Sequence, residues 1–481
     1  MLIKDSCRML RIFVPVLIPL CFSLLSCAHV ESMDPFQTRS QTPLSAAIPY
    51  EGPTMPEPAK PQWTTAPVEI EEGVLSLADC IRIGLELNPR TQSSWQGMKA
   101  AAARIGVEQS AYLPEVDFFS SANREKLLSS QHILTGQSID PGNVFDAGFG
   151  LSYLLFDGGA RSARVDGSKS DFQAEAFLHN AVLQDSALSI ERAYYQLLAA
   201  RWALQVAEET VNNTAYHVRL ANARYDNGLV PRSDVLKAET EKADADLSLV
   251  GARNGVRIAE GALASAMGMK VSAPIKIADI NSDVHAREVE QIDQLLDEAT
   301  RNRPELRAAT AQIRAREASI KEAGSQWWPK LNADAGYGWA DDVFAPRRDE
   351  WAIGVSLTFP LFTGFKRGYQ VQQARRVADR AQADYQTQLR SVELEVWTAY
   401  SDLIEAGEAI EAARSFVASA EESARLAQGE YKAGAGDIIA LIDAQTALTT
   451  AQNRLVQARL GWHTARVQFE RAVGRSLLAG R

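Results

Sequence analysis

The feature that most constrains this chain is an internal duplication of its sequence. Pro89 and Pro304 stand 215 residues apart, and the same offset relates Tyr112-Leu113-Pro114 to Trp327-Trp328-Pro329. Further along, an offset of 206 relates eight identical pairs: Phe156/Phe362, Gly158/Gly364, Arg161/Arg367, Tyr194/Tyr400, Tyr225/Tyr431, Gly228/Gly434, Ala238/Ala444 and Gly268/Gly474. Two constant offsets, separated by a single change from 215 to 206, indicate two copies of one unit. We assign repeat 1 to residues 75–280 and repeat 2 to 281–481, with one nine-residue deletion between about residues 120 and 145 of the first copy.

Each repeat contains a predicted β-hairpin, at residues 116–156 and 331–362. Residues 351–362 alternate between large apolar and small polar side chains, with Leu357 on one face and Ser356 on the other. Residues 145–155 alternate in the same way, and a period of two is typical of strands. A strand of about ten residues has the length of a tilted transmembrane β-strand. A half-buried strand of a soluble sandwich is the alternative for any one segment alone.

Long helical hairpins follow the strands, at residues 160–268 and 366–474. No proline interrupts residues 160–226, which are rich in strong helix formers and would make a helix of roughly 100 Å at about 1.5 Å per residue. Gly228 and Gly434 follow the long helices at the position where a C-terminal cap needs positive φ. Shorter helices are predicted at 77–88 and 89–111, and the helix at 89–111 would stack end to end with the returning helix to nearly match the length of the long one. The pattern predicts one long rod and one composite rod per repeat.

Four strands cannot close a membrane barrel, and an open sheet edge is not tolerated in lipid. The chain is therefore expected to oligomerise. Two copies would give eight strands and a filled interior, whereas three would give twelve strands and a lumen.

The first residues predict export and lipid attachment. Basic residues precede an apolar run from Ile12 to Leu25, which is too short to cross a membrane and typical of a signal peptide, here residues 1–26. The run ends in Leu24-Leu25-Ser26-Cys27, which resembles a bacterial lipobox with Cys27 as the lipidated residue. A plain secretory signal with a chance cysteine is the alternative, and either Met1 or Met9 could be the start. Residues 27–74 are proline-rich and predict an extended tether.

Composition excludes several function classes. The formal charge is −10 and there is no basic cluster, which argues against nucleic-acid binding. The four cysteines and six histidines are scattered without metal-ligand spacing, and no nucleophile elbow or phosphate-binding glycine loop occurs. We therefore expect no enzyme activity, no metal, and no cofactor other than a covalent lipid on Cys27.

The order of these features resembles the TolC-type outer-membrane factor family. The motifs that carry the resemblance are Leu155-Phe156-Asp157-Gly158-Gly159 with Arg161, Leu361-Phe362-Thr363-Gly364 with Arg367, Tyr225-Asp226-Asn227-Gly228-Leu229, and Tyr431-Lys432-Ala433-Gly434-Ala435. The resemblance covers about residues 75–475. It implies an α+β membrane protein, in which a homotrimer forms a 12-stranded β-barrel that continues as a long α-helical barrel into the periplasm of a Gram-negative bacterium. Sorting to the outer membrane agrees with Ala28 after the cysteine.

The resemblance also implies a periplasmic tip with a gate and a docking surface. Asp443 matches an aspartate that lines the entrance in the family, so three copies would form an acidic ring. Ala440 and Gly436 depart from the family pattern, and Asp437 would replace part of the missing charge. Lys237, the counterpart of Asp443 in repeat 1, would flank the ring. The turns that would meet an adaptor contain Asn227, Gly228, Leu229, Ala433, Gly434 and Ala435. A solvated charge at a helix start is the alternative for Asp443.

The function that the resemblance implies is passive export through an outer-membrane channel. A periplasmic adaptor and an inner-membrane pump would deliver small molecules to the channel. The exit duct of a type I protein secretion system is the first alternative, and a structural lipoprotein that spans the periplasm is the second. The sequence does not identify the cargo, because the pump usually selects it.

Overall fold

The computed structural model describes residues 45–48, 74–125, 142–278 and 291–475. The signal peptide, Cys27 and most of the tether lie outside these residues. The described residues form two compact units. We call residues 99–168 and 321–367 the sheet unit, and residues 43–98, 169–320 and 368–481 the helical unit. Each unit draws on both repeats, so the spatial units do not follow the sequence duplication.

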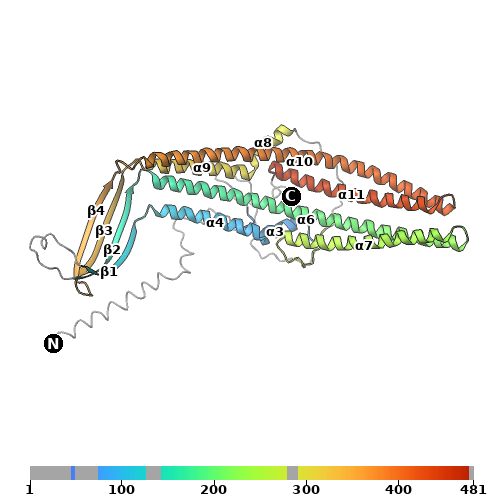
Figure 1. Cartoon of the computed structure of the whole chain (residues 1–481), viewed down its shortest axis with the longest axis horizontal. Coiled ribbons are helices and arrows are strands. Elements are labelled where there is room, and N and C mark those ends of the chain that lie inside the picture. Colours follow the sequence, from blue (N-terminus) through green and yellow to red (C-terminus); the bar gives the residue numbers. More distant parts are fainter. Residues whose placement is uncertain (1–44, 49–73, 126–141, 279–290, 476–481) are drawn as a thin grey trace, which may run out of the picture. The chain divides into compact units, whose positions relative to one another are not determined.

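The order of elements repeats once along the chain (Figure 1). Repeat 1 contains α3 (Leu77–Leu87), α4 (Pro89–Ser110), β1 (Glu115–Glu125), β2 (Gly142–Phe156), α6 (Ala160–Asp226) and α7 (Arg232–Ala266). Repeat 2 contains α8 (Ile292–Asn302), α9 (Pro304–Ser325), β3 (Lys330–Asp341), β4 (Arg348–Thr358), α10 (Lys366–Ala433) and α11 (Ile438–Val473). The predicted helical hairpins and the α+β class are confirmed. No helix in the described part of the chain is both long and apolar enough to span a bilayer.

The four strands form one antiparallel sheet in the order β1-β2-β3-β4. Two details of the predicted hairpins are wrong. β4 ends at Thr358 and not at 362, because Pro360 has no N–H to donate to the strand ladder. The connection between strands is longer in the first copy, residues 126–141, than in the second, residues 342–347, so the shorter copy is the second.

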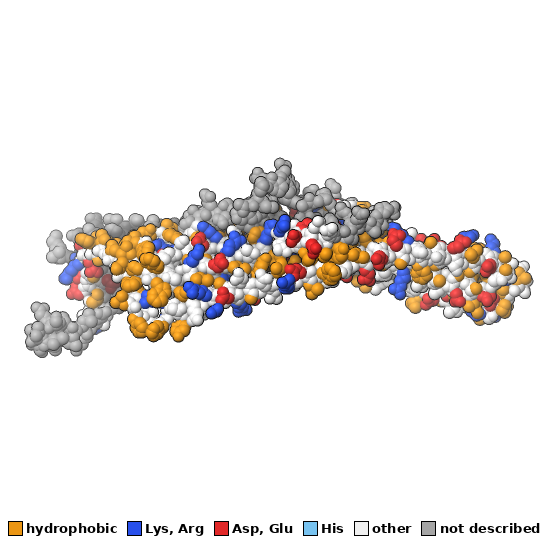
Figure 2. Space-filling model, turned by 90° about the horizontal axis from the view of Figure 1, so that it is seen from above, with side chains coloured by type: hydrophobic (Ala, Val, Ile, Leu, Met, Phe, Trp, Pro, Cys, Tyr) orange, Lys and Arg blue, Asp and Glu red, His pale blue; other side chains and the backbone are white. Residues whose placement is uncertain are grey.

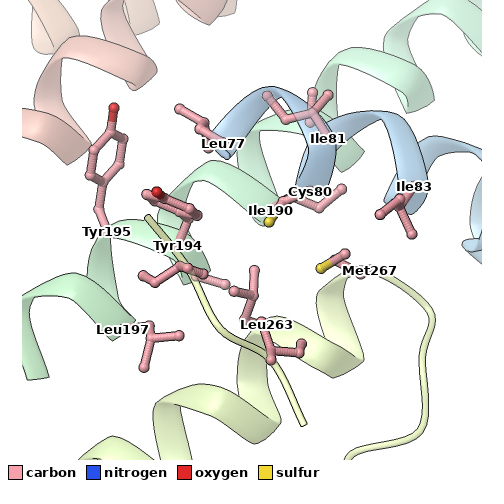
Figure 3. Packing of buried hydrophobic residues seen from close by; sticks show 14 of the residues in the cluster. Leu77, Cys80, Ile81, Ile83, Ile190, Tyr194, Tyr195, Leu197, Leu263 and Met267 are labelled. Carbon is pink, nitrogen blue, oxygen red and sulfur yellow. The ribbon is translucent and has the colours of Figure 1, made fainter. Parts of the chain in front are cut away.

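One apolar core of the helical unit lies where α7 ends against the junction of α3 and α4, and a second lies at the equivalent place in repeat 2. Figure 3 shows the first, in which Leu77, Cys80, Ile81 and Ile83 of α3 lie close to Ile190, Tyr194, Tyr195 and Leu197 of α6, to Leu263 of α7 and to Met267 directly after α7. Burial raises the pKa of the Cys80 thiol to about 12, so this free cysteine is an inert apolar contact. The predicted end-to-end stacking is confirmed: Asn88 Nδ2 donates to the carbonyl oxygen of Ala266 at 2.9 Å.

Candidate functional site

One face of the sheet is apolar across all four strands. The strand register places these residues on the same side: Val116, Phe118, Phe149, Leu151, Tyr153, Ala333, Ala335, Tyr337, Trp339, Trp351, Ile353, Val355 and Leu357. Most of the large side chains among them are exposed; Leu357, for example, is 67% exposed. Figure 2 shows hydrophobic side chains gathered on the part of the surface that contains the strands. The alternation predicted from sequence is confirmed, and the face has no covering layer among the described residues.

Aromatic residues border this apolar face at two levels. Phe118, Phe149, Tyr337 and Trp351 are directly opposite one another in successive strands and form one row. The second level lies at the strand ends, where these aromatic side chains are exposed: Trp327, Trp328, Phe359, Phe362 and Phe365. From Trp351 to the end of β4 at Thr358 is seven residue steps, or about 23 Å of extended chain, and the exposed Phe359, Leu361 and Phe362 continue the apolar surface beyond the strand end. An apolar band between aromatic girdles is typical of a transmembrane β-barrel.

Most side chains on the opposite face of the sheet are small or polar, and Phe119, Val144 and Leu154 are large apolar exceptions. This face also carries Glu115, Asp117, Ser121, Asp146, Gly148, Gly150, Ser152, Asn332, Asp334, Gly336, Gly338, Glu350, Ala352, Gly354 and Ser356. Its carboxylates outnumber the basic side chains of Lys330 and Arg348 on the same face. Such a wall suits contact with water, and its excess of carboxylates favours cations.

Two arginines hold the strand-to-helix junctions of the sheet unit. Arg161 donates from Nη1 to the carbonyl of Ala111 at 3.1 Å and from Nη2 to that of Leu155 at 3.2 Å, and its guanidinium lies 4.7 Å from the Tyr112 ring centroid. Its Nε lies 3.3 Å from Asp157.

Arg367 makes the equivalent carbonyl contacts in repeat 2. Its two carbonyl acceptors are the counterparts of Ala111, at an offset of 215, and of Leu155, at an offset of 206. Its Nη1 donates to Gln326 at 3.4 Å and its Nη2 to Leu361 at 3.2 Å, while its guanidinium lies 4.4 Å from the Trp327 ring centroid. The two sequence offsets thus describe one recurring junction, which explains why these arginines and aromatic residues are repeated.

Both helical hairpins turn through the same cap. In the first, the N–H of Leu229 donates to the carbonyl of Arg224 at 2.9 Å, and Gly228 has φ +69°. In the second, the N–H of Ala435 donates to the carbonyl of Glu430 at 2.9 Å, and Gly434 has φ +84°. This is the Schellman arrangement, in which glycine takes the left-handed position. The turn residues Asn227, Gly228, Leu229, Ala433, Gly434 and Ala435 are all exposed.

The two hairpin tips differ in their tyrosines. Tyr431 is fully buried, and its ring lies under the guanidinium of Arg224 at 4.5 Å, whereas its counterpart Tyr225 is 42% exposed. Arg224 Nη1 also donates to the carbonyl of Tyr431. Burial raises the pKa of the Tyr431 phenol, and the nearby charge of Asp234 raises it further. Sequence comparison of the repeats missed this contact, because Glu430 takes the place of Arg224 in the second copy.

The predicted gate residues occupy different settings at these tips. Asp437 is the N-cap of α11 and accepts from the N–H of Ala440 at 2.7 Å, so its charge stabilises a helix start. Asp443 is exposed on α11, and Lys237 is exposed on α7. Burial raises the pKa of Glu241 on α7, and the negative charges of Asp244 and Asp443 raise it further. The charge near Asp443 is therefore supplemented by acids of repeat 1 that sequence comparison did not identify.

Comparison with known proteins identifies the fold and the family. The outer membrane efflux protein family matches residues 81–269 and 295–475, one stretch in each repeat. "Protein CyaE" of Bordetella pertussis is 28% identical over 422 residues, which cover 87% of each chain. "Outer membrane protein TolC" of Vibrio cholerae is 23% identical over 407 residues, covering 83% of this chain and 90% of that protein.

The fold is shared with solved membrane proteins. A crystal structure of a membrane protein from Pseudomonas aeruginosa superposes with a TM-score of 0.74 at 20% identity, covering 84% of this chain and 91% of the other. The predicted resemblance is thereby confirmed. The chain belongs to the outer membrane efflux protein family.

Proposed function

We propose that three copies of this chain form one outer-membrane channel, in which twelve strands close a pore and the helical hairpins form its periplasmic tunnel. As a member of its family the chain is an efflux channel and not an enzyme. The observation that carries the trimer is the sheet itself. Among the described residues, β1 and β4 each pair on one side only, and both border an exposed apolar face. Pairing β4 of one copy with β1 of the next would satisfy both edges.

The chemistry of the two sheet faces predicts which of them points outward in the proposed barrel. The apolar face, with its aromatic rows, suits lipid, and the polar face suits a water-filled lumen. On β4, Leu357 would face the lipid and its neighbour Ser356 would face the lumen. A twelve-stranded barrel is wide enough to leave an open lumen, whereas eight strands would fill it with side chains.

Cys27 would carry the lipid that fixes the mature N-terminus to the outer membrane. The support is the Leu24-to-Cys27 sequence with the proline-rich stretch behind it. Mass spectrometry of the purified protein should find a lipidated Cys27 as the first residue. An unmodified Cys27, or a start further along the chain, would disprove the anchor while leaving the channel proposal intact.

The hairpin tips would meet a periplasmic adaptor, which connects the channel to an inner-membrane pump. The exposed side chain of Leu229, 67% accessible, offers an apolar contact at the tip. Leu229→Glu should therefore abolish adaptor-dependent efflux and leave conductance in planar bilayers unchanged. Loss of conductance in this variant would contradict a docking role, because it would place Leu229 in the pore or in the fold.

Asp443 would form the acidic ring at the tunnel entrance, with Lys237 beside it. Single-channel recording in planar bilayers tests both the channel and its gate. The wild-type protein should conduct as a trimer, and Asp443→Ala should weaken block by multivalent cations from the periplasmic side and lower cation selectivity. Lys237→Ala should strengthen the block. Absence of conductance would overturn the channel, whereas an unchanged block in Asp443→Ala would make that residue an ordinary solvated charge.

A further inference from the structure

A block of four glycines interrupts the polar face of the sheet. Gly148 lies opposite Gly338, and Gly150 lies opposite Gly336, so β2 and β3 present only backbone over two successive rows. A Cβ on Gly148 would lie 2.8 Å from the Cα of Gly338, and a Cβ on Gly338 would lie 2.9 Å from the carbonyl oxygen of Ala147. The close approach of the two strands therefore requires glycine in this row.

Phe119 of β1 lies beside and partly over this glycine block. It pairs with Gly148, and its ring lies 4.0 Å from the position that a Cβ on Gly150 would take. Phe118, one residue earlier, faces the opposite side and contacts Phe149 with ring centroids 5.3 Å apart. Although it covers part of the block, Phe119 remains 46% exposed. A large apolar ring is thus left open on a face whose other side chains are mostly small or polar.

Carboxylates flank the ring on the same face. Asp117 lies two residues before Phe119 in β1, and Glu350 of β4 lies opposite Gly338 in the same row as Phe119. Both side chains belong to exposed residues. Gly148 and Gly338 in the row of Phe119 are buried, and the Phe119 ring covers Gly148, because a Cβ there would lie 2.9 Å from the ring. The glycines that stay partly exposed are those of the next row, Gly150 and Gly336, beside Asp117. This floor without side chains leaves room for a flat molecule beside the ring, the ring favours aromatic contact, and the carboxylates favour positive charge.

We propose that Phe119, together with Asp117 and Glu350, forms a contact site for aromatic cations on the inner wall of the pore. The inference rests on the proposed function, because it needs the polar face to line a lumen. In the trimer three such sites would surround the axis at one level. Small cations would pass with attraction to the carboxylates alone, whereas aromatic cations would also contact the ring and stay longer.

Single-channel block separates the two contributions. Benzyltrimethylammonium carries both a ring and a charge, and tetramethylammonium carries only the charge. Wild-type channels should be blocked more strongly by the benzyl compound. Phe119→Ala should weaken that block by roughly threefold to tenfold, the effect of losing one aromatic contact, and leave tetramethylammonium block unchanged. Asp117→Asn combined with Glu350→Gln should weaken the block by both cations.

Two further variants keep the test decisive. Phe118→Ala is the matched control, because it removes a neighbouring ring from the opposite face, and its block by both cations should equal the wild-type value. Phe119→Leu keeps an apolar side chain over the glycines and is measured if Phe119→Ala does not assemble. An unchanged benzyltrimethylammonium block in Phe119→Leu, or an equal loss in Phe118→Ala, would overturn the site. Wild-type protein that does not conduct would instead overturn the channel.

Discussion

The two repeats solve the same structural problem with different chemistry. In each, the returning helix ends at a left-handed glycine, Gly268 or Gly474, against the junction of two short helices. Both joints contain a buried apolar cluster. In repeat 1 the end of the returning helix is held by a neutral hydrogen bond from Asn88 to the carbonyl of Ala266. Repeat 2 places Arg303 where repeat 1 has Asn88, and the Arg303 side chain is only 4% exposed.

The arginine of repeat 2 organises a buried ionic network. Its Nη1 donates to the carbonyls of Arg471 and Ala472 at 3.3 and 3.2 Å, its Nη2 to Glu395 at 2.7 Å, and its Nε to Glu305 at 3.2 Å. Burial alone would raise the pKa of the Glu305 carboxyl, but the positive charges of Arg471 and Arg303 outweigh it and hold that pKa below its ordinary value. The comparison teaches that two equivalent apolar joints can be completed by a neutral hydrogen bond or by a network of charges, and that the second should be less tolerant of a single change.

The largest expected effect is the loss of Arg303. Arg303→Ala should destabilise the protein by about 3 kcal/mol, because it leaves the carbonyls of Arg471 and Ala472 without their side-chain donor and removes one of the two arginines that pair with Glu305. Asn88→Ala, the matched change in repeat 1, should cost about 1 kcal/mol, the value of a single neutral hydrogen bond. Thermal unfolding in detergent, followed by circular dichroism at 222 nm, measures the difference. Equal shifts in the two variants would remove the contrast between the joints.

In the sheet, unlike the joints, we expect equivalent substitutions in the two repeats to have the same effect. Leu357→Arg in β4 and its counterpart Leu151→Arg in β2 should each destabilise the barrel by about 2–4 kcal/mol if they lie near the bilayer midplane. Ser356→Arg, on the opposite face, should be tolerated and should change conductance. Trimer yield and conductance report the outcome. If Leu357→Arg and Ser356→Arg behave alike, the assignment of the two faces is wrong.

The strand-to-helix junctions should differ by a smaller amount. Both Arg161→Ala and Arg367→Ala leave two backbone carbonyls without their side-chain donor. Arg161→Ala also removes the ion pair of the Asp157 side chain, which is 7% exposed, whereas Arg367→Ala removes a neutral contact to the hydroxyl of Thr363. We expect a loss of about 2 kcal/mol at Arg161 and about 1 kcal/mol at Arg367. The double variant Asp157→Thr/Arg161→Ala should behave like Arg367→Ala. If it remains as unstable as Arg161→Ala, the ion pair is not the cause of the difference.

The smallest effect concerns pH. Burial lowers the pKa of His463 to about 4, and the positive charges of Arg466 and Arg459 add to this effect. Its ring stacks on Tyr195 with centroids 4.2 Å apart, and its counterpart in repeat 1 is the exposed Arg257. The folded-state pKa lies below the unfolded value of about 6.5, so the unfolded state takes up the proton first and stability falls as pH drops from 6.5 toward 4.

The part of the acid sensitivity that comes from His463 should be lost when its imidazole is replaced, whereas the buried His179 and His217, whose pKa values burial also lowers, should keep their own contribution. At pH 5.5 the wild-type protein should be less stable than at pH 7.5 by about 1 kcal/mol on account of His463. His463→Phe keeps a flat ring against Tyr195 and should show a correspondingly smaller loss on acidification. Thermal midpoints at the two pH values give the comparison, and an identical loss in both proteins would exclude His463 as the source.

Periodicity and repetition predicted the strands, the long helices and their duplication, because both patterns can be recognised in the sequence without knowledge of tertiary contacts. The alternation around Leu357 identified the two sheet faces, and the offsets identified Arg161 and Arg367 as equivalents before their shared contacts were known. Arg303 escaped detection, since its partners Glu395 and Arg471 lie 92 and 168 residues away and its counterpart is an asparagine. The sequence alone did not show that Asp437 caps α11, and its contribution to the gate stays a prediction. The facing of Phe119 could not be predicted, because Phe118 and Phe119 are adjacent and the alternation does not distinguish them.

The duplication also affects how the proposed assembly would form. β2 of repeat 1 pairs with β3 of repeat 2 inside one chain, so three of the six hairpin-to-hairpin seams of a closed barrel are already made when a monomer folds. A ring built from separate single hairpins would need six bodies to meet. Covalent linkage turns half of those encounters into intramolecular ones. Closure would then depend on the third power of monomer concentration and not the sixth, so that assembly would fall less steeply when monomers are dilute.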